Sequence, residues 1–219
     1  QSIKPELSSI IIQNDENEIV FAATDSFRLA EKRIKIKKGG EIGTVLIPFK
    51  NIPEIIKVLE DAPQDIEVRI DSNQIAFSFE NTYLISRIID GTFPDYKQII
   101  PKDFKTEVVV LKEDIVSALK ITNIFSDTFN QVQFSINPSK KEFILQTKNP
   151  DLGESTQNIN TAVSGEDLFI NFNHKYIFDS FQSIDSDSVS LSFGGLGKPL
   201  LIKGVNDRSF FCIVMPMNR

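Results

Sequence analysis

The sequence is poor in the residues that most often carry redox and metal chemistry. Its 219 residues include one cysteine, Cys212, one histidine, His174, and no tryptophan. A single cysteine excludes a disulfide within the chain and fits a reducing compartment. No Cys/His cluster is available for zinc, and a Ser-His-Asp triad would have to use His174. Because His174 stands beside Lys175 at a predicted helix start, we expect it to be solvated or to cap the helix.

Long apolar runs and an excess of basic residues are also missing. No stretch approaches the roughly 20 apolar residues that a membrane span needs, and no secretory signal pattern opens the chain. The formal net charge of −6 argues against coating of nucleic acid by bulk electrostatics, although it is compatible with a local basic surface. We therefore expect a cytoplasmic protein without a membrane partner. The chain begins with Gln1 rather than Met, as expected of a fragment or a processed product.

Three short motifs resemble ligand sites but lack the required residues. "GGLGKP" (194–199) has neither the spacer nor the Ser/Thr of a phosphate loop, so a glycine-rich hairpin turn is predicted. The acidic stretches "NDENE" (14–18) and "DSDS" (185–188) lack the glycine and final glutamate of a calcium loop. A hydrolase with unrecognised carboxylates is an alternative, but no pair of carboxylates stands out. We expect no catalytic residue, cofactor or metal, and hence not an enzyme.

The chain repeats itself with an offset of 123 residues. The corresponding pairs are "IVFAATDS" (19–26) with "EFILQTKN" (142–149), "IPFKNIPEIIKVLED" (47–61) with "INFNHKYIFDSFQSID" (170–185), and "IEVRI" (66–70) with "VSLSF" (189–193). The order strand, strand, helix, strand, strand recurs at constant spacing, which predicts two copies of one domain. Two unrelated β-rich halves with coincidental spacing are the alternative interpretation.

Apolar spacing predicts one amphipathic helix within each copy, over 49–60 and over 173–185. The residues expected to be buried are Ile52, Ile55, Ile56 and Leu59 in the first helix, and Tyr176, Ile177, Phe181 and Ile184 in the second. The second copy begins with two further predicted elements, a strand over 106–111 and a helix over 112–126. Ile115, Leu119 and Thr122 are expected on the buried face of that helix.

The counterparts of this strand and helix would lie 123 residues earlier in the chain, mostly before Gln1. The first copy is therefore predicted to be truncated, with "SIKPELS" (2–8) left from its first helix. The predicted fold is α+β: a tandem repeat of antiparallel sheets with two helices per intact domain. The domains are expected over 1–103 and 104–219.

The chain remains apolar almost to its last residue. A final strand is predicted to hold Phe211 and Ile213 in the core. Pro216 lacks the N–H that a sheet ladder uses, so Met215, Pro216 and Met217 are expected just outside the strand. Methionine suits adaptable binding surfaces because its side chain is flexible and polarisable. The tail is therefore a candidate binding surface.

Five stretches, taken in order, resemble the β sliding clamp family, the processivity factors of bacterial replicative polymerases. They are "TDSFRLA" (24–30), "ISRIIDGTFPDYKQIIP" (85–101), "NPDLGES" (149–155), "FNHKYIFDSF" (172–181) and "VMPM" (214–217). The resemblance covers essentially the whole chain. It implies the second and third of three clamp domains, and a non-catalytic function: full-length members close as a head-to-tail dimeric ring around duplex DNA.

The resemblance also implies partners. Duplex DNA would be encircled without sequence specificity, and the replicative polymerase, the clamp loader and repair factors would bind through short linear peptides. These peptides typically carry a glutamine followed by leucine and phenylalanine. The full-length protein would be a homodimer, whereas this chain, without the first domain, is expected not to close a ring. A generic β-rich interaction scaffold without a DNA role is the alternative.

Carried across residue by residue, the resemblance assigns three sets of site residues. The peptide-binding groove between the second and third domains would use Leu7, Thr24, Arg28, Leu29, Pro94, Ile99, Phe129, Asn173, Tyr176, Pro199, Ile213, Val214, Met215, Pro216 and Met217. DNA-facing lysines would be Lys4, Lys50, Lys57, Lys112, Lys120 and Lys175, and the dimer interface would include Ile124, Asp151 and Glu154. Ser26 and Phe27 depart from the family's usual small residue and histidine, and Pro199 replaces a commonly small polar residue, which bears on peptide preference.

Overall fold

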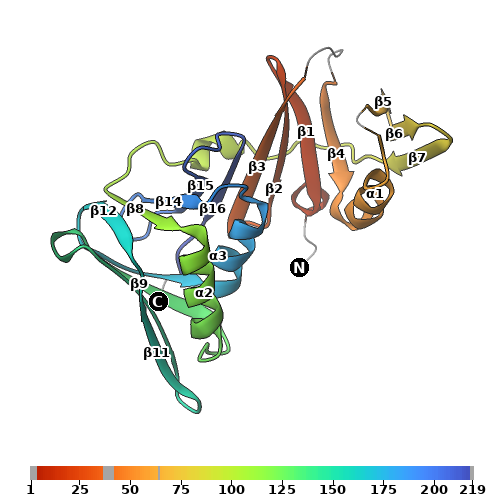
Figure 1. The fold of residues 1–219 in the computed structure, drawn as a ribbon. Helices are drawn as coiled ribbons and strands as arrows, with labels where there is room; N and C mark the ends of the chain where they lie inside the picture. The colour runs from red at the N-terminus through yellow and green to blue at the C-terminus, as the bar shows by residue number, and fades with distance from the viewer. Residues whose placement is uncertain (1–3, 37–41, 64, 218–219) are drawn as a thin grey trace. The chain divides into compact units, whose positions relative to one another are not determined.

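The chain divides into two compact units of α+β structure. The computed structural model describes residues 4–36, 42–63 and 65–217 and is drawn in Figure 1. The first unit consists of Gln1–Ser26 and Glu31–Asp95, and the second of Phe27–Ala30 and Tyr96–Arg219. The predicted domain boundary at 103/104 stays a prediction. Among the described residues, no helix is long and apolar enough to cross a membrane.

The described residues of the first unit form two sets of antiparallel strands and one α-helix. After a 3-10 helix (Pro5–Ser8) come β1 (Ser9–Asp15), β2 (Glu18–Thr24), β3 (Arg28–Lys35) and β4 (Thr44–Pro48), which lie side by side in the order β3, β2, β1, β4. Residues 28–30 of β3 are counted with the second unit. A 3-10 turn (Phe49–Asn51) leads into α1 (Ile52–Leu59). The strands β5 (Glu67–Asp71), β6 (Gln74–Phe79) and β7 (Thr82–Arg87) form the second sheet in that order.

Only one side of α1 is buried. Ile55 is buried in the core of the first unit, and Ile52 and Leu59 pack partly against it. Ile56, which was expected on the same side, is instead 53% exposed. The helix has only eight residues, and Ile56 lies about 100° around the axis from Ile55, so the core contacts one narrow face.

The second unit contains two larger sheets and two helices. Its elements are β8 (Thr106–Leu111), α2 (Lys112–Asn123), β9 (Gln131–Asn137), β10 (Glu142–Asn149), β11 (Gly153–Asn158), β12 (Thr161–Gly165), β13 (Leu168–Asn173), α3 (His174–Ser180), β14 (Ser188–Phe193), β15 (Leu200–Gly204) and β16 (Phe210–Val214). One sheet has the order β12, β8, β14, β15, β16, and the other β11, β10, β9, β13. Helices α2 and α3 lie side by side (Figure 1).

The same succession of elements occurs twice. In the first unit it reads β1, β2, β3, β4, α1, β5, β6, β7, and in the second β9, β10, β11, β13, α3, β14, β15, β16. The counterpart of β12 would fall at residues 38–42, most of which lie outside the described residues. No counterpart of β8 and α2 occurs among the described residues of the first unit. Of "SIKPELS", the described part includes the 3-10 helix, and residues 2 and 3 lie outside it. The predicted repeat is confirmed.

Phenylalanine rings form the centre of the second unit's core. Phe134 is fully buried and has its ring centroid 5.3 Å from those of Phe143 and Phe172, and 6.4 Å from that of Phe193. These rings come from strands of both sheets, so the cluster joins the two sheets. The predicted faces of α2 and α3 are confirmed: Ile115, Leu119, Thr122, Ile177, Phe181 and Ile184 are buried, and Tyr176 is half-buried.

The predicted inward face of β16 is half correct, because Ile213 is buried but Phe211 is not. Phe210, Cys212 and Val214 belong to the core, and Phe211 is only half-buried. The pairing with β15 explains this phase, because Cys212 lies opposite Ile202 and Val214 opposite Leu200, both core residues. Ile213 is also buried, so it does not alternate with its neighbours. The predicted glycine-rich hairpin is confirmed, since "GGLGKP" joins the antiparallel strands β14 and β15.

Phe134→Ala is expected to lower the free energy of unfolding by about 3–5 kcal/mol, because it removes a fully buried ring and leaves a cavity. Chemical denaturation followed by circular dichroism measures the loss. Phe169 on β13 is 56% exposed, so Phe169→Ala is a matched control that should change stability by less than about 0.5 kcal/mol. Equal losses in the two variants would contradict the described core.

Candidate functional site

The carboxy-terminal tail is attached to the second unit at two points. After β16 ends at Val214, the backbone N–H of Met215 donates to the carbonyl of Phe27 at 2.8 Å. Two residues later, the N–H of Met217 donates to the carbonyl of Asn171 on β13, also at 2.8 Å. Pro216 between them has no N–H to donate. The tail therefore has a fixed path, and the Met215 side chain is 37% exposed beside it.

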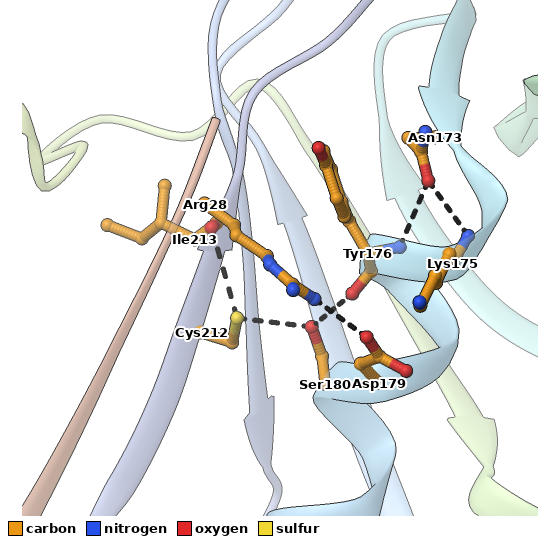
Figure 2. A network of polar contacts seen from close by, with 8 residues as sticks. All are labelled: Arg28, Asn173, Lys175, Tyr176, Asp179, Ser180, Cys212 and Ile213. Atoms are coloured by element: carbon orange, nitrogen blue, oxygen red, sulfur yellow. Dashed lines mark hydrogen bonds and ion pairs between the residues drawn. The ribbon is translucent and has the colours of Figure 1, made fainter. Parts of the chain in front are cut away.

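Arg28, the first residue of β3, is held by two residues of α3. Its guanidinium forms an ion pair with Asp179 at 2.8 Å and lies over the ring of Tyr176, 4.6 Å from the ring centroid (Figure 2). Tyr176 and Asp179 are three residues apart, so they share one face of the helix. About a third of each charged side chain is exposed, so we assign the ion pair only a modest energy, on the order of 1 kcal/mol or less. Its main effect is to fix the orientation of Arg28.

Helix α3 is fixed at its start and against β16. The side-chain oxygen of Asn173 accepts from the N–H groups of Lys175 (3.0 Å) and Tyr176 (3.3 Å), and so caps the helix (Figure 2). The Asn173 amide donates to the carbonyl of Phe129 at 3.3 Å. At the other end, the Ser180 hydroxyl donates to the Tyr176 carbonyl (2.8 Å) and lies 3.1 Å from the sulfur of Cys212 (Figure 2).

Phe27 completes an exposed apolar surface. Its ring is 60% exposed and stacks on Tyr176, with the centroids 6.4 Å apart and the planes 26° apart. We call the surface formed by Phe27, Tyr176 and Met215 the aromatic patch. Phe27 was not among the predicted site residues; the signal in the sequence was an apolar residue directly after the polar turn Thr-Asp-Ser.

The residue before Phe27 has an unfavourable backbone conformation. Ser26 has φ +74°, in the left-handed region that favours glycine. Its N–H donates to the Thr24 hydroxyl at 3.2 Å. Such strain in a side-chain-bearing residue tends to persist at functional positions, where the surrounding structure imposes it.

Ser26→Val is expected to lower the free energy of unfolding by about 1–2 kcal/mol, because a β-branched residue at positive φ is strained. Ser26→Gly should be tolerated within about 0.5 kcal/mol, since glycine adopts this conformation without a steric penalty. Thermal or chemical unfolding of the two variants tests the difference. Equal stability of the valine and glycine variants would argue against the left-handed conformation.

His174 is not solvated and does not cap α3, contrary to the prediction from sequence. It is buried, its Nε2 atom is 2.7 Å from the Leu119 carbonyl on α2, and its ring stacks on Phe178. The cap is its neighbour Asn173. Burial lowers the pKa of His174, while the hydrogen bond to Leu119 and the charge of Asp179 oppose that shift. A neutral imidazole whose Nε2–H donates to the carbonyl joins α2 to α3.

This lowered pKa makes stability depend on pH. The histidine pKa in an unfolded chain is about 6.5, so the unfolded state binds the proton more readily than the folded state. The free energy of unfolding is therefore highest above pH 6.5. It decreases as the pH falls from there through the lower folded pKa. We expect the melting temperature to fall more between pH 7.5 and pH 5 in the native protein than in His174→Gln. Parallel pH profiles would contradict a neutral, buried His174.

The structure brings several predicted groove residues together in the second unit. Arg28 pairs with Asp179 and lies over Tyr176, the N–H of Met215 donates to the carbonyl of Phe27, which precedes Arg28, and Asn173 joins Phe129 to α3. Pro216 and Met217 follow in the tail and are half-buried, Pro199 is half-buried before β15, and Ile99 is 48% exposed in the 3-10 helix Tyr96–Ile99.

Other predicted groove residues do not present side chains at the surface or belong to the first unit. Leu29, Ile213 and Val214 are each at most 1% exposed, so a ligand would reach them only after a rearrangement. The remaining three lie in the first unit: Leu7 is half-buried in its 3-10 helix, Thr24 ends β2, and Pro94 is exposed. Their roles stay predictions.

The predicted lysines differ in their availability. Lys112 is half-buried, and its amine donates to the carbonyl of Ile184. The other five are exposed: Lys4, Lys50, Lys57, Lys120 and Lys175.

Two of the three residues predicted at the dimer interface line a hollow of the second unit. Ile124, just after α2, is 64% exposed. Asp151 and Glu154 line a hollow of about 650 Å³ bordered by β9, β10, β11 and the loops beside them, together with Phe129.

Comparison with known proteins places both units in one family. Residues 1–95 match the DNA polymerase III beta subunit, central domain, and residues 97–218 match the DNA polymerase III beta subunit, C-terminal domain. A beta sliding clamp of Staphylococcus epidermidis is 28% identical over 215 residues, which cover 98% of this chain and 57% of that relative.

Solved structures agree. The DNA polymerase III beta subunit from Thermotoga maritima is 30% identical with a TM-score of 0.90, and the DNA polymerase sliding clamp from Bacillus subtilis is 28% identical with a TM-score of 0.93. They cover 98% and 100% of this chain, and each comparison covers 58% of the other chain.

Two tandem α+β units with one element order define a repeated-domain protein, and each unit matches its own domain of a single family. The chain belongs to the DNA polymerase III beta subunit family. It spans under three fifths of the length of the relatives it matches.

Proposed function

We propose that this chain contributes the partner-binding part of a DNA sliding clamp. A clamp of this kind performs no chemistry; it is a ring around duplex DNA that holds polymerases and other replication factors in place. The family membership and the relatives named as sliding clamps support this function. We place the activity in the cytoplasm, where the bacterial chromosome is replicated.

The observation that carries the proposal is an exposed aromatic patch beside a fixed carboxy-terminal tail. Phe27 and Met215 are exposed apolar side chains, although their backbones are held by a hydrogen bond to each other. A surface that is already ordered loses little conformational entropy when a ligand binds. Apolar anchors of a short linear peptide would be buried against this patch, while backbone groups of the tail would set the peptide's direction.

Other predicted groove residues extend this proposal. Ile99 and Phe129 are exposed in the second unit and offer additional apolar contacts. Leu7, Thr24 and Pro94 of the first unit are proposed as contacts on the family resemblance alone.

The contacts with DNA and with a second protomer are further parts of the proposal. The five exposed lysines would approach phosphates without reading bases, as weak, salt-sensitive contacts. Lys112 is the weakest candidate, because its amine is already bonded to Ile184. Ile124, Asp151 and Glu154, which are all exposed, would face another protomer in the assembled ring.

Titration of a fluorescently labelled peptide of the Gln-Leu-Phe type tests the function. We expect saturable binding that Met215→Ala and Tyr176→Ala each weaken about 5- to 30-fold, since truncating a central apolar contact removes about 1–2 kcal/mol. Fluorescence anisotropy gives the dissociation constants.

Phe49→Ala is the matched control, because Phe49 is a 64% exposed phenylalanine in the first unit and lies outside the proposed site. It should bind the peptide like the native protein. Absence of saturable binding, or equal binding by the native protein and both patch variants, would refute the proposed function.

A further inference from the structure

The sulfur atoms of this chain occur in one short segment near its end. The sequence contains two methionines, Met215 and Met217, and one cysteine, Cys212. Peroxides oxidise the sulfur of methionine and cysteine side chains, and exposed sulfur reacts more readily than buried sulfur. These three side chains are therefore the candidates for such a reaction in this chain.

The structure separates the three side chains by their exposure. Cys212 is 4% exposed and belongs to the core of the second unit, where its sulfur accepts from the Ser180 hydroxyl at 3.1 Å (Figure 2). Met217 is half-buried, and its N–H donates to the Asn171 carbonyl. Met215 is 37% exposed. It is therefore the side chain of the three that a dissolved peroxide reaches most readily.

We propose that Met215 is an oxidative modification site, at which a peroxide converts the thioether to a sulfoxide and thereby weakens peptide binding. This inference rests on the proposed peptide-binding function. In the reaction, a lone pair of the sulfur attacks one oxygen of hydrogen peroxide, the O–O bond breaks and an S–O bond forms. The sulfur loses two electrons, and the other oxygen takes up the proton of the transferred oxygen and leaves as water.

A sulfoxide changes this part of the aromatic patch from apolar to polar. Its oxygen accepts hydrogen bonds from water while the patch is uncovered. An apolar peptide side chain that covers Met215 would remove this water and supply no donor in its place. The unsatisfied acceptor then opposes binding, a penalty that the thioether does not impose.

The fold is expected to tolerate the same change. Met215 directly follows β16, and its backbone N–H, rather than its side chain, forms the hydrogen bond to the Phe27 carbonyl at 2.8 Å. Because the side chain is exposed, the added oxygen can remain in water. Methionine sulfoxide reductases remove such an oxygen at the expense of thiols, so the modification is reversible.

Hydrogen peroxide is the probe that tests the inference. The native protein is treated with it, the excess is destroyed with catalase, and tandem mass spectrometry locates each added oxygen. Binding of the labelled Gln-Leu-Phe peptide, which contains no sulfur, is then measured. We expect oxygen on Met215 before Met217 and Cys212, and a dissociation constant about 10-fold higher, as for one unsatisfied polar group. Incubation with reductases for both sulfoxide epimers should restore the affinity.

Two variants separate the contributions of the two methionines. For each protein, the readout is the ratio of the dissociation constants after and before treatment, so a difference in basal affinity does not enter. Met215→Leu lacks the exposed sulfur and should give a ratio near one. Met217→Leu retains Met215 and should give the native ratio. Melting curves before and after treatment should coincide for every protein.

Each contrary outcome has its own meaning. Oxygen found first on Met217 or Cys212, an unchanged dissociation constant once Met215 is oxidised, or equal ratios in the native protein and Met215→Leu would overturn the modification site while leaving the proposed function intact. A large fall in melting temperature on oxidation would do the same, because the loss of binding would then reflect unfolding. If the untreated native protein does not bind the peptide, the proposed function fails and this inference fails with it.

Discussion

Two backbone hydrogen bonds, from Met215 to Phe27 and from Met217 to Asn171, determine how the end of this chain is presented. Without them, a segment that follows the last strand and contains a proline would be expected to fray, as most chain ends do. With them, the tail becomes an ordered surface whose first methionine remains exposed beside Phe27 and Tyr176. The candidate site therefore depends on backbone geometry before it depends on any particular side chain.

The groups that receive these bonds are themselves held by the core of the second unit. Asn171 lies on β13, whose neighbour Phe172 packs into the phenylalanine cluster around Phe134. Phe27 precedes Arg28, which Asp179 and Tyr176 of α3 hold in place. Helix α3 is in turn capped by Asn173 and joined to α2 through the buried His174. Buried apolar packing thus positions an exposed apolar surface, and polar contacts set its orientation.

Much of the fold could be predicted from the sequence, because alternation and helical spacing report local structure directly. The strand over 106–111 and the 123-residue repeat follow from these patterns and are confirmed. The predictions of buried residues were wrong where tertiary packing, rather than local spacing, determines which side chains are buried. Ile56 follows the helical spacing yet is exposed, and the inward face of β16 is set by its pairing with β15 rather than by its own sequence.

The candidate site was less accessible to sequence reasoning. The resemblance pointed to Arg28, Tyr176 and Met215, but their contacts with Asp179 and Phe27 join segments about 150 to 190 residues apart. No local pattern encodes such contacts. His174 illustrates the same point, since a histidine beside a lysine is usually solvated, whereas here α2 and Phe178 enclose it.

Hydrogen exchange at the Met215 and Met217 amides, followed by nuclear magnetic resonance with and without a bound peptide, tests the central claim most directly. If the tail is held by its two backbone hydrogen bonds, both amides should exchange on the order of a hundredfold or more slowly than in an unstructured chain. A peptide bound to the aromatic patch should slow them further. Exchange at the unstructured rate, unchanged by the peptide, would contradict an ordered tail and the site built on it.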